Sequence, residues 1–212
     1  MNILIVGAGS KFGSELYQKL EHNNNVFGIS GSKNQNNFLT VDWEKCQFTD
    51  FEKWLKQLPK LNLVVFNQNY KSLHINYFSY REHIAKTWQQ ERNWQQGHFV
   101  NCILPLHILH SLHHYQNLDS EAKICFMLSK TVINLDYPVI PDYRGQKYQN
   151  LMTLKELAKN DTRTYIGLCP GELDNKVYVS KADIISKFLL QDNLVSSLFY
   201  DTTDNGVIPL NI

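Results

Sequence analysis

Tyr143 and Lys147 have the residue types and the spacing needed for acid–base chemistry on a carbonyl or alcohol oxygen. They lie four residues apart in a segment, 142–159, whose pattern predicts a helix, so both side chains are expected on one helix face. A lysine ammonium about 4 Å from a phenol lowers the phenol's pKa from about 10 by up to about three units, at an effective dielectric of about 20. The pair is therefore a candidate proton donor with a cationic partner.

The spacing of this pair is weak evidence when taken alone. A chain with 11 tyrosines and 17 lysines among 212 residues contains about one such pair by chance. The non-catalytic alternative is a half-buried tyrosine beside a solvated lysine. The surrounding residues, and the elements that position them, must decide between the two interpretations.

A glycine-rich segment near the start of the chain, Gly-Ala-Gly-Ser-Lys-Phe-Gly, follows the apolar run 3–6 and precedes a segment of helical period. Glycines allow a tight turn and a close approach to a pyrophosphate, and the amides that open the helix can donate to its oxygens. This context predicts a dinucleotide-binding turn, and the alternative is a turn without a ligand. The candidate binding residues are Gly7, Gly9, Ser10, Lys11, Phe12 and Gly13.

The end of the second predicted strand bears on the choice of cofactor. An acidic residue at that point would accept the ribose hydroxyls and select NAD, but this chain has Ser30, with Lys33 close behind. A cation is thus within reach of the additional phosphate of NADP, and no acid repels it. We expect NADP as the cofactor, with NAD as the alternative.

Short apolar runs alternate with helical stretches along the chain, which predicts repeated β-α units. Strands are expected at residues 3–6, 26–29, 38–41, 61–66, 123–128, 164–168 and 194–200. Helices are expected after Thr49 and Ser180 as caps, and over residues 80–115 with a break at Gly97. The predicted fold class is α/β, a Rossmann-type doubly wound parallel β-sheet with helices on both faces, in a single domain of residues 1–212.

Several stretches resemble short-chain dehydrogenases/reductases, in the order in which that family carries them. Residues 63–69 are similar to the strand that runs into Asn-Asn-Ala-Gly, with Asn67 as the match. Residues 99–102 resemble the stretch with the active-site asparagine, here Asn101, and residues 124–129 resemble the strand that ends in the catalytic serine, here Ser129. Tyr143 and Lys147 follow.

Three further positions extend this resemblance over nearly the whole chain. Cys169-Pro170-Gly171 is similar to the Pro-Gly that closes over the nicotinamide, and Asp42 stands where the family has an adenine-contacting aspartate. The glycine turn fits the family's longer spacing, with Lys11 in place of a further glycine. The resemblance implies that Asp42, Asn67, Tyr143, Lys147, Pro170 and Gly171 contribute to the cofactor site.

The resemblance also implies an activity: an NAD(P)-dependent oxidoreductase that interconverts a carbonyl and a secondary alcohol of a small molecule. Tyr143 is then the proton donor, Ser129 holds the substrate oxygen, and Asn101 anchors a water that leads to Lys147. Taken alone, Ser129 is equally explained as a strand-end residue and Asn101 as a helix cap.

The segment 172–179 has no threonine for the cofactor amide and leaves a short lid, or none, over the substrate side. This departure supports the alternative of a non-catalytic dinucleotide-binding subunit or redox sensor on the same fold. A sugar-nucleotide epimerase is disfavoured because the chain is too short for the substrate domain of those relatives.

A formal net charge of +1 argues against a nucleic-acid or membrane-surface partner. The first apolar run ends at Gly7 without a preceding basic region, and the four cysteines form no Cys-x-x-Cys pair, so we expect a cytoplasmic protein with reduced thiols. His107, His110, His113 and His114 share a helix face without a completing acid or cysteine, so no metal is expected. That helix is instead expected to contribute to a homo-oligomer, a dimer or tetramer, as in related proteins.

Overall fold

A single eight-stranded sheet forms the centre of the molecule in the computed structural model, which describes residues 1–31, 37–69, 95–134, 141–170, 178–203 and 206–209. The strand order is β3-β2-β1-β4-β5-β6-β7-β8. Neighbouring strands from β3 to β7 are parallel, and β8 pairs antiparallel with β7. This arrangement confirms the predicted Rossmann-type α/β class, in which the strand order reverses between β1 and β4.

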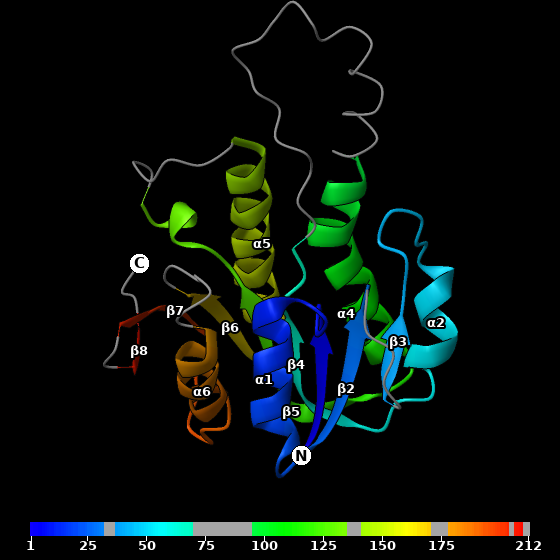
Figure 1. Cartoon of the computed structure of the whole chain (residues 1–212), viewed down its shortest axis with the longest axis horizontal. Coiled ribbons are helices and arrows are strands. Elements are labelled where there is room, and N and C mark those ends of the chain that lie inside the picture. The colour runs from blue at the N-terminus through cyan, green and yellow to red at the C-terminus, as the bar shows by residue number, and fades with distance from the viewer. Residues whose placement is uncertain (32–36, 70–94, 135–140, 171–177, 204–205, 210–212) are drawn as a thin grey trace, which may run out of the picture.

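The elements follow one another as alternating strands and helices (Figure 1). The strands are β1 (Asn2–Val6), β2 (Asn25–Ser30), β3 (Phe38–Thr40), β4 (Leu61–Phe66), β5 (Leu118–Met127), β6 (Thr164–Cys169), β7 (Ser197–Thr203) and β8 (Gly206–Pro209). The helices are α1 (Lys11–Glu21), α2 (Thr49–Leu55), the π-helix η1 (Phe99–Ile103), α4 (Leu104–His114), the 3₁₀-helix η2 (Lys130–Val132), α5 (Pro141–Asn160) and α6 (Tyr178–Leu189). None of the helices in these ranges is long and apolar enough to cross a membrane.

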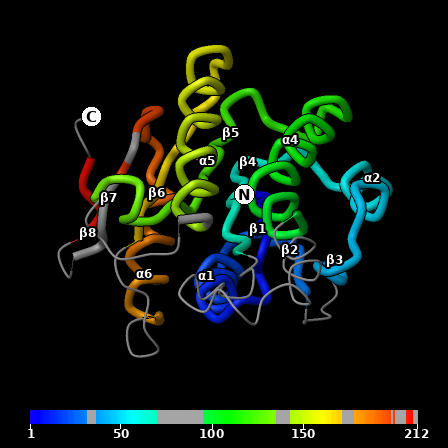
Figure 2. The backbone as a smooth tube through the Cα atoms, turned by 90° about the horizontal axis from the view of Figure 1, so that it is seen from above, coloured from blue at the N-terminus to red at the C-terminus, as the bar shows by residue number. Residues whose placement is uncertain are grey.

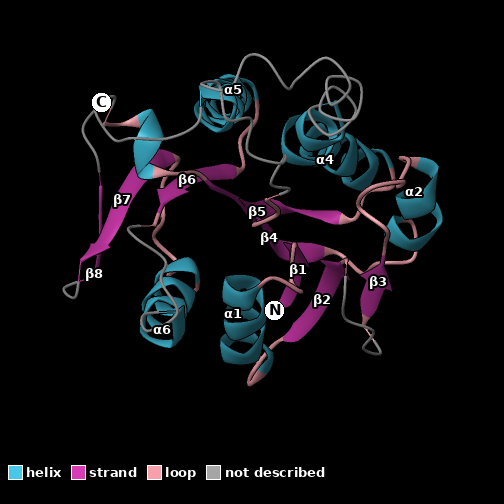
Figure 3. Cartoon of the chain, turned by 45° about the horizontal axis from the view of Figure 1, so that its top comes forward, coloured by secondary structure: helices cyan, strands magenta, loops and turns pink. Residues whose placement is uncertain are grey.

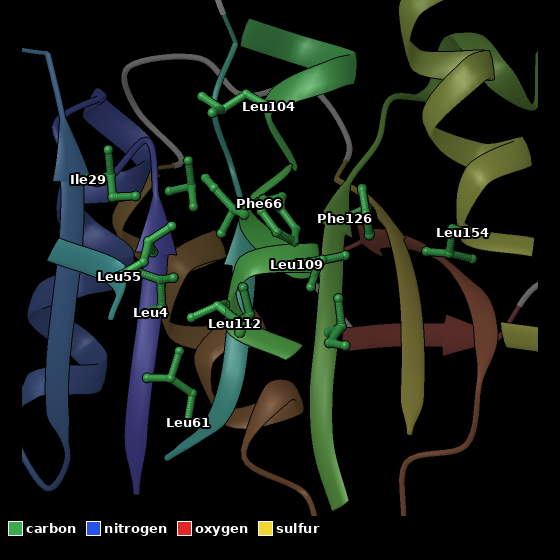
Figure 4. Close-up of a cluster of buried hydrophobic side chains, with 14 of the residues drawn as sticks. Leu4, Ile29, Leu55, Leu61, Phe66, Leu104, Leu109, Leu112, Phe126 and Leu154 are labelled. Carbon is green, nitrogen blue, oxygen red and sulfur yellow. The ribbon is translucent and has the colours of Figure 1, made fainter. Parts of the chain in front are cut away.

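Helices cover both faces of the sheet, with α1 and α6 on one side and α2, α4 and α5 on the other (Figures 2 and 3). Successive residues of a strand point to opposite faces. In β1, Leu4 and Val6 therefore pack with the cluster under α4 (Figure 4), while Ile3 and Ile5 pack with the cluster under α1. The apolar strands expected at the centre of the sheet therefore contribute side chains to both hydrophobic clusters.

Several predicted boundaries are wrong. Strand β5 begins at Leu118, five residues before the predicted start, because it also pairs with β4 at Leu61. Thr49 does not cap a helix, since Phe48 holds the capping position and has no side-chain cap bond. Ser180 lies inside the first turn of α6, which starts at Tyr178. Strand β8 was not predicted.

The helix that leads into α4 is irregular at a different place from the predicted one. Residues 95–98, which include Gly97, are helical, so the expected break at Gly97 is wrong. The irregularity is the π-helical turn η1, directly before α4. Such wide turns occur frequently at functional sites.

Candidate functional site

The glycine turn joins β1 to α1 at the carboxyl edge of the sheet. Gly7 has φ +86, and a Cβ there would lie 2.7 Å from the backbone of Gln68. A Cβ on Gly13 would lie 2.2 Å from the Gly7 carbonyl oxygen. Only glycine fits at these two positions, because backbone atoms of the neighbouring segments fill the space that a side chain would take. The two glycines therefore allow the tight turn that a dinucleotide-binding segment needs.

Two side chains fix the shape of this turn. Ser10 caps α1, and its hydroxyl accepts a hydrogen bond of 3.0 Å from the Gly13 amide. The Asn67 side-chain amide donates to the Gly7 carbonyl at 3.3 Å and to the Ser10 hydroxyl at 3.0 Å, linking β4 to the turn. Gly9 is half-buried, Phe12 is buried in the core under α1, and Lys11 is exposed at the first position of the helix. The turn is pre-formed, with its helix amides facing the edge where a dinucleotide would lie.

The strand ends beside this turn are the expected site of the adenosine. Ser30 is fully buried at the end of β2, and Asp42 is exposed after β3, where its carboxylate accepts from the Glu44 amide at 3.0 Å. Lys33 lies outside the described residues. Sequence reasoning missed Trp43, whose ring would be 2.3 Å from a Cβ on Gly31. An indole thus covers the backbone directly after Ser30, and no sequence signal pairs these two residues.

Gln68, also missed, is buried beside Gly7 with 5% of its surface exposed. Within the described part of the chain its side-chain carbonyl has no hydrogen-bond partner. An unsatisfied buried polar group costs about 1–3 kcal/mol, so Gln68→Met is expected to raise the free energy of unfolding by about 1 kcal/mol. Urea titration of the cofactor-free protein checks this prediction. A loss of stability would contradict it and would show that the Gln68 amide makes a net stabilising contact.

Ser129 and Tyr143 meet above the end of β5. Ser129 caps η2, and its hydroxyl accepts a weak hydrogen bond of 3.4 Å from the Thr131 amide. Burial raises the pKa of Tyr143 above its ordinary value, a hydrogen bond with the Ser129 side chain lowers it, and the Cys169 thiol nearby raises it. The two hydroxyl groups are therefore in direct contact, as a proton donor and a substrate-holding group require.

Lys147 lies one helical turn from Tyr143 and is 4% exposed. Its ammonium stands 5.7 Å from the centre of the Tyr143 ring and donates a hydrogen bond of 2.9 Å to the Met127 carbonyl of β5. Burial lowers the pKa of Lys147 to about 8, and the nearby thiols of Cys102 and Cys169 oppose this effect. The expectation of a solvated lysine, which belonged to the non-catalytic alternative, is therefore wrong.

Lys147 was expected to lower the pKa of Tyr143, but this is not the largest effect on that pKa in the structure. The pKa of Tyr143 is raised, with burial as the largest cause, instead of lowered by the ammonium. The reason is that both groups are withdrawn from water, which disfavours the phenolate and the ammonium alike. Tyr143 is accordingly held as a neutral phenol, the form that donates a proton.

Asn101 lies inside η1 and is 1% exposed. Its side-chain amide donates a hydrogen bond of 2.7 Å to the Gln146 side chain. Its main-chain carbonyl accepts a hydrogen bond of 3.0 Å from the Asn150 side chain. The interpretation of Asn101 as a helix cap is wrong, because helical backbone continues on both sides. Pro170 is buried after β6, and Gly171 lies outside the described residues.

The structure thus brings all four predicted catalytic residues to α5 and its immediate neighbours. Ser129 contacts Tyr143, Tyr143 is beside Lys147, and Asn101 is bonded to the residue next to Lys147. Among the described residues, no group of three histidine, cysteine or acidic side chains is placed to hold a metal ion.

Solved structures share the fold of this chain over almost its full length. A short-chain dehydrogenase family protein from Francisella tularensis matches with a TM-score of 0.71 and 18% identity, covering 94% of this chain and 96% of that one. A protein from Shigella flexneri, described as a short-chain dehydrogenase complexed with NADP, matches with a TM-score of 0.74 and 14% identity, covering 94% and 95%. This chain has the short-chain dehydrogenase fold. The resemblance seen in the sequence is confirmed at that level.

The short-chain dehydrogenase fold is also found in BdcA in complex with NADPH, with a TM-score of 0.72, 11% identity and coverage of 94% of this chain and 92% of that one. No family model matches the sequence, and a search of curated proteins finds no match. At 11–18% identity, the similarity to these neighbours extends to the fold alone.

Proposed function

We propose that this chain is an NADP(H)-dependent oxidoreductase that interconverts a carbonyl and a secondary alcohol of a small molecule. The observation that carries the proposal is the contact of Ser129 with Tyr143, with Lys147 beside it, at the same sheet edge as the glycine turn. A proton donor, a group to hold the substrate oxygen and a dinucleotide cradle are the three components that such a reaction needs.

The residues have distinct tasks in this proposal. The amides at the start of α1 bind the pyrophosphate, and Asn67 keeps the turn in its binding conformation. The bound nicotinamide supplies or accepts the hydride. Ser129 donates a hydrogen bond to the carbonyl oxygen of the substrate, and Tyr143 gives that oxygen its proton as the alcohol forms. Lys147 provides positive charge beside the phenol, which favours the phenolate left after the proton has moved.

NADP is proposed over NAD because Ser30 replaces an acid at the end of β2 and Lys33 follows it. The neighbours from Shigella flexneri and BdcA are complexed with NADP and NADPH, respectively, which is consistent with this choice. Self-association into a dimer or tetramer remains a prediction from the sequence.

The test is a paired calorimetric titration with NADPH and NADH. We expect NADPH to bind about tenfold or more tightly, which corresponds to about 1.4 kcal/mol for one additional charge contact. Lys33→Glu is expected to weaken NADPH binding and to leave NADH binding unchanged. Lys60→Glu, directly before β4 at the opposite end of the sheet, is the charge-matched control. Tighter binding of NADH would overturn the assignment of NADP, and binding of neither below millimolar concentration would refute the proposed function.

A non-catalytic dinucleotide-binding subunit or redox sensor is the second candidate, favoured by the segment 172–179, which has no threonine for the cofactor amide. A screen of aldehydes and ketones with NADPH separates the two. Binding without turnover of any carbonyl would support the sensor.

A further inference from the structure

Three buried amide side chains connect η1 to α5. The Asn101 side chain donates to the Gln146 side chain at 2.7 Å, and the Asn150 side chain donates to the main-chain carbonyl of Asn101 at 3.0 Å. The thiol of Cys102 adds a weaker contact of 3.6 Å to the Gln146 carbonyl. We call Asn101, Gln146 and Asn150 the amide brace.

All three members of the amide brace are buried. Asn101, Gln146 and Asn150 are 1%, 6% and 5% exposed. Burial of an amide is unfavourable unless it is hydrogen-bonded, and an apolar contact would hold two helices together at lower cost. The three residues therefore contribute something that apolar packing does not supply, namely a defined relative position.

The brace surrounds Lys147 along α5. Gln146 directly precedes Lys147, and Asn150 follows it by one turn on the face that also carries Tyr143. On the other side, Lys147 itself is bonded to the Met127 carbonyl of β5. The helix is thus tied to η1 on one side and to the sheet on the other, both at the level of the proposed catalytic pair.

We propose that Gln146 and Asn150 are positioning residues, which act through Asn101 to hold α5 where the Lys147 ammonium stands beside the Tyr143 phenol. The inference rests on the proposed function for its effect on catalysis. In this role Asn101 fixes the position of α5 relative to η1. Its side chain bonds Gln146, and its main-chain carbonyl accepts from Asn150. A small displacement of α5 moves the ammonium relative to the phenol, and a displacement of about 1 Å can lower a catalytic rate by about 100-fold.

The experiment compares Gln146→Leu and Asn150→Leu with Gln149→Leu, a matched control on the same helix outside the brace. We expect the brace variants to lower kcat for carbonyl reduction by about 10- to 100-fold, with KM changed by less than about threefold. The double variant Gln146→Leu/Asn101→Ala should lose little more than Gln146→Leu, because these two side chains bond each other. Asn150 keeps its acceptor, the Asn101 main-chain carbonyl, when Asn101 becomes alanine. Asn150→Ala replaces any brace variant that does not fold.

A second measurement does not depend on turnover. The ultraviolet absorbance of the phenolate is titrated in the parent and in each brace variant, and the same titration in a Tyr143→Phe background isolates the signal of Tyr143. We expect the pKa of Tyr143 to move back towards its ordinary value of 10.0 in the brace variants, because a displaced α5 lets water reach the phenol that burial now shields. An unchanged phenol titration with unchanged kcat and lowered stability would overturn the inference. A parent that binds NADPH but reduces no carbonyl would contradict the proposed reaction, while the phenol titration would still decide on the brace.

Discussion

Replacement of Tyr143 by phenylalanine is expected to lower kcat for carbonyl reduction by about 1,000-fold and to change the affinity for NADPH by less than about threefold. General acid catalysis by a positioned side chain contributes about 10²- to 10⁴-fold, and phenylalanine keeps the buried ring while it removes the proton. Because burial holds Tyr143 as the neutral phenol, the parent should be fully active as a reductase at neutral pH. Steady-state kinetics with saturating NADPH and the best carbonyl of the screen checks this result.

Ser129→Ala provides the comparison for Tyr143→Phe. It removes the hydrogen bond to the substrate oxygen but leaves the proton donor, so its loss should be smaller, about 10²-fold. If Tyr143→Phe kept more than about a tenth of the parental kcat, another group would have to supply the proton, and the proposed role of Tyr143 would fail.

Replacement of Lys147 by methionine is expected to have two opposite effects. Carbonyl reduction should fall by at least about 100-fold, because the positive charge beside the phenol is lost. The folded chain should become more stable at pH 7, since burial lowers the pKa of Lys147 from 10.5 to about 8. At about 1.4 kcal/mol per pKa unit, the buried ammonium costs about 3 kcal/mol, and the Met127 carbonyl left without its donor reduces the net gain to about 1–2 kcal/mol.

The pH dependence gives this stability change a distinctive sign. A lysine whose pKa is lowered by folding destabilises the protein fully below the folded pKa of about 8. This destabilisation shrinks as the pH rises from 8 towards 10.5 and is absent above that value. Urea denaturation of the parent and Lys147→Met at pH 7 and pH 9.5 should therefore show a larger difference at pH 7. An equal difference at both values would show that the ammonium is not the cause.

The central strands and the glycine turn were predictable because each is specified by neighbouring residues. In β4 the apolar run 63–66 is typical of a strand buried on both faces. Gly7 and Gly13 indicate a turn, because its backbone conformation and close contacts are ones that only glycine tolerates. The candidate residues Asn101, Ser129, Tyr143 and Lys147 came from the resemblance of their order to that of a known family.

The remaining features depend on partners far apart in the sequence. Gln146 and Asn150 look like ordinary polar residues of an exposed helix, and only the π-turn at Asn101 places their partners within reach. The pKa values of Tyr143 and Lys147 likewise follow from the loss of water around them, which a spacing of four residues does not encode.

The alternation of β1 between two cores bears on how such a chain changes over evolutionary time. Each position of the strand needs only an apolar side chain of suitable volume, and many combinations satisfy that requirement. Two chains can therefore share this architecture at low identity, and this chain and its structural neighbours do so at 11–18%. Gly7 and Gly13 have no such freedom, because any larger residue collides with backbone. Relatives too distant for sequence comparison should be sought by these few inflexible positions and their order, with the interior of the sheet left free to vary.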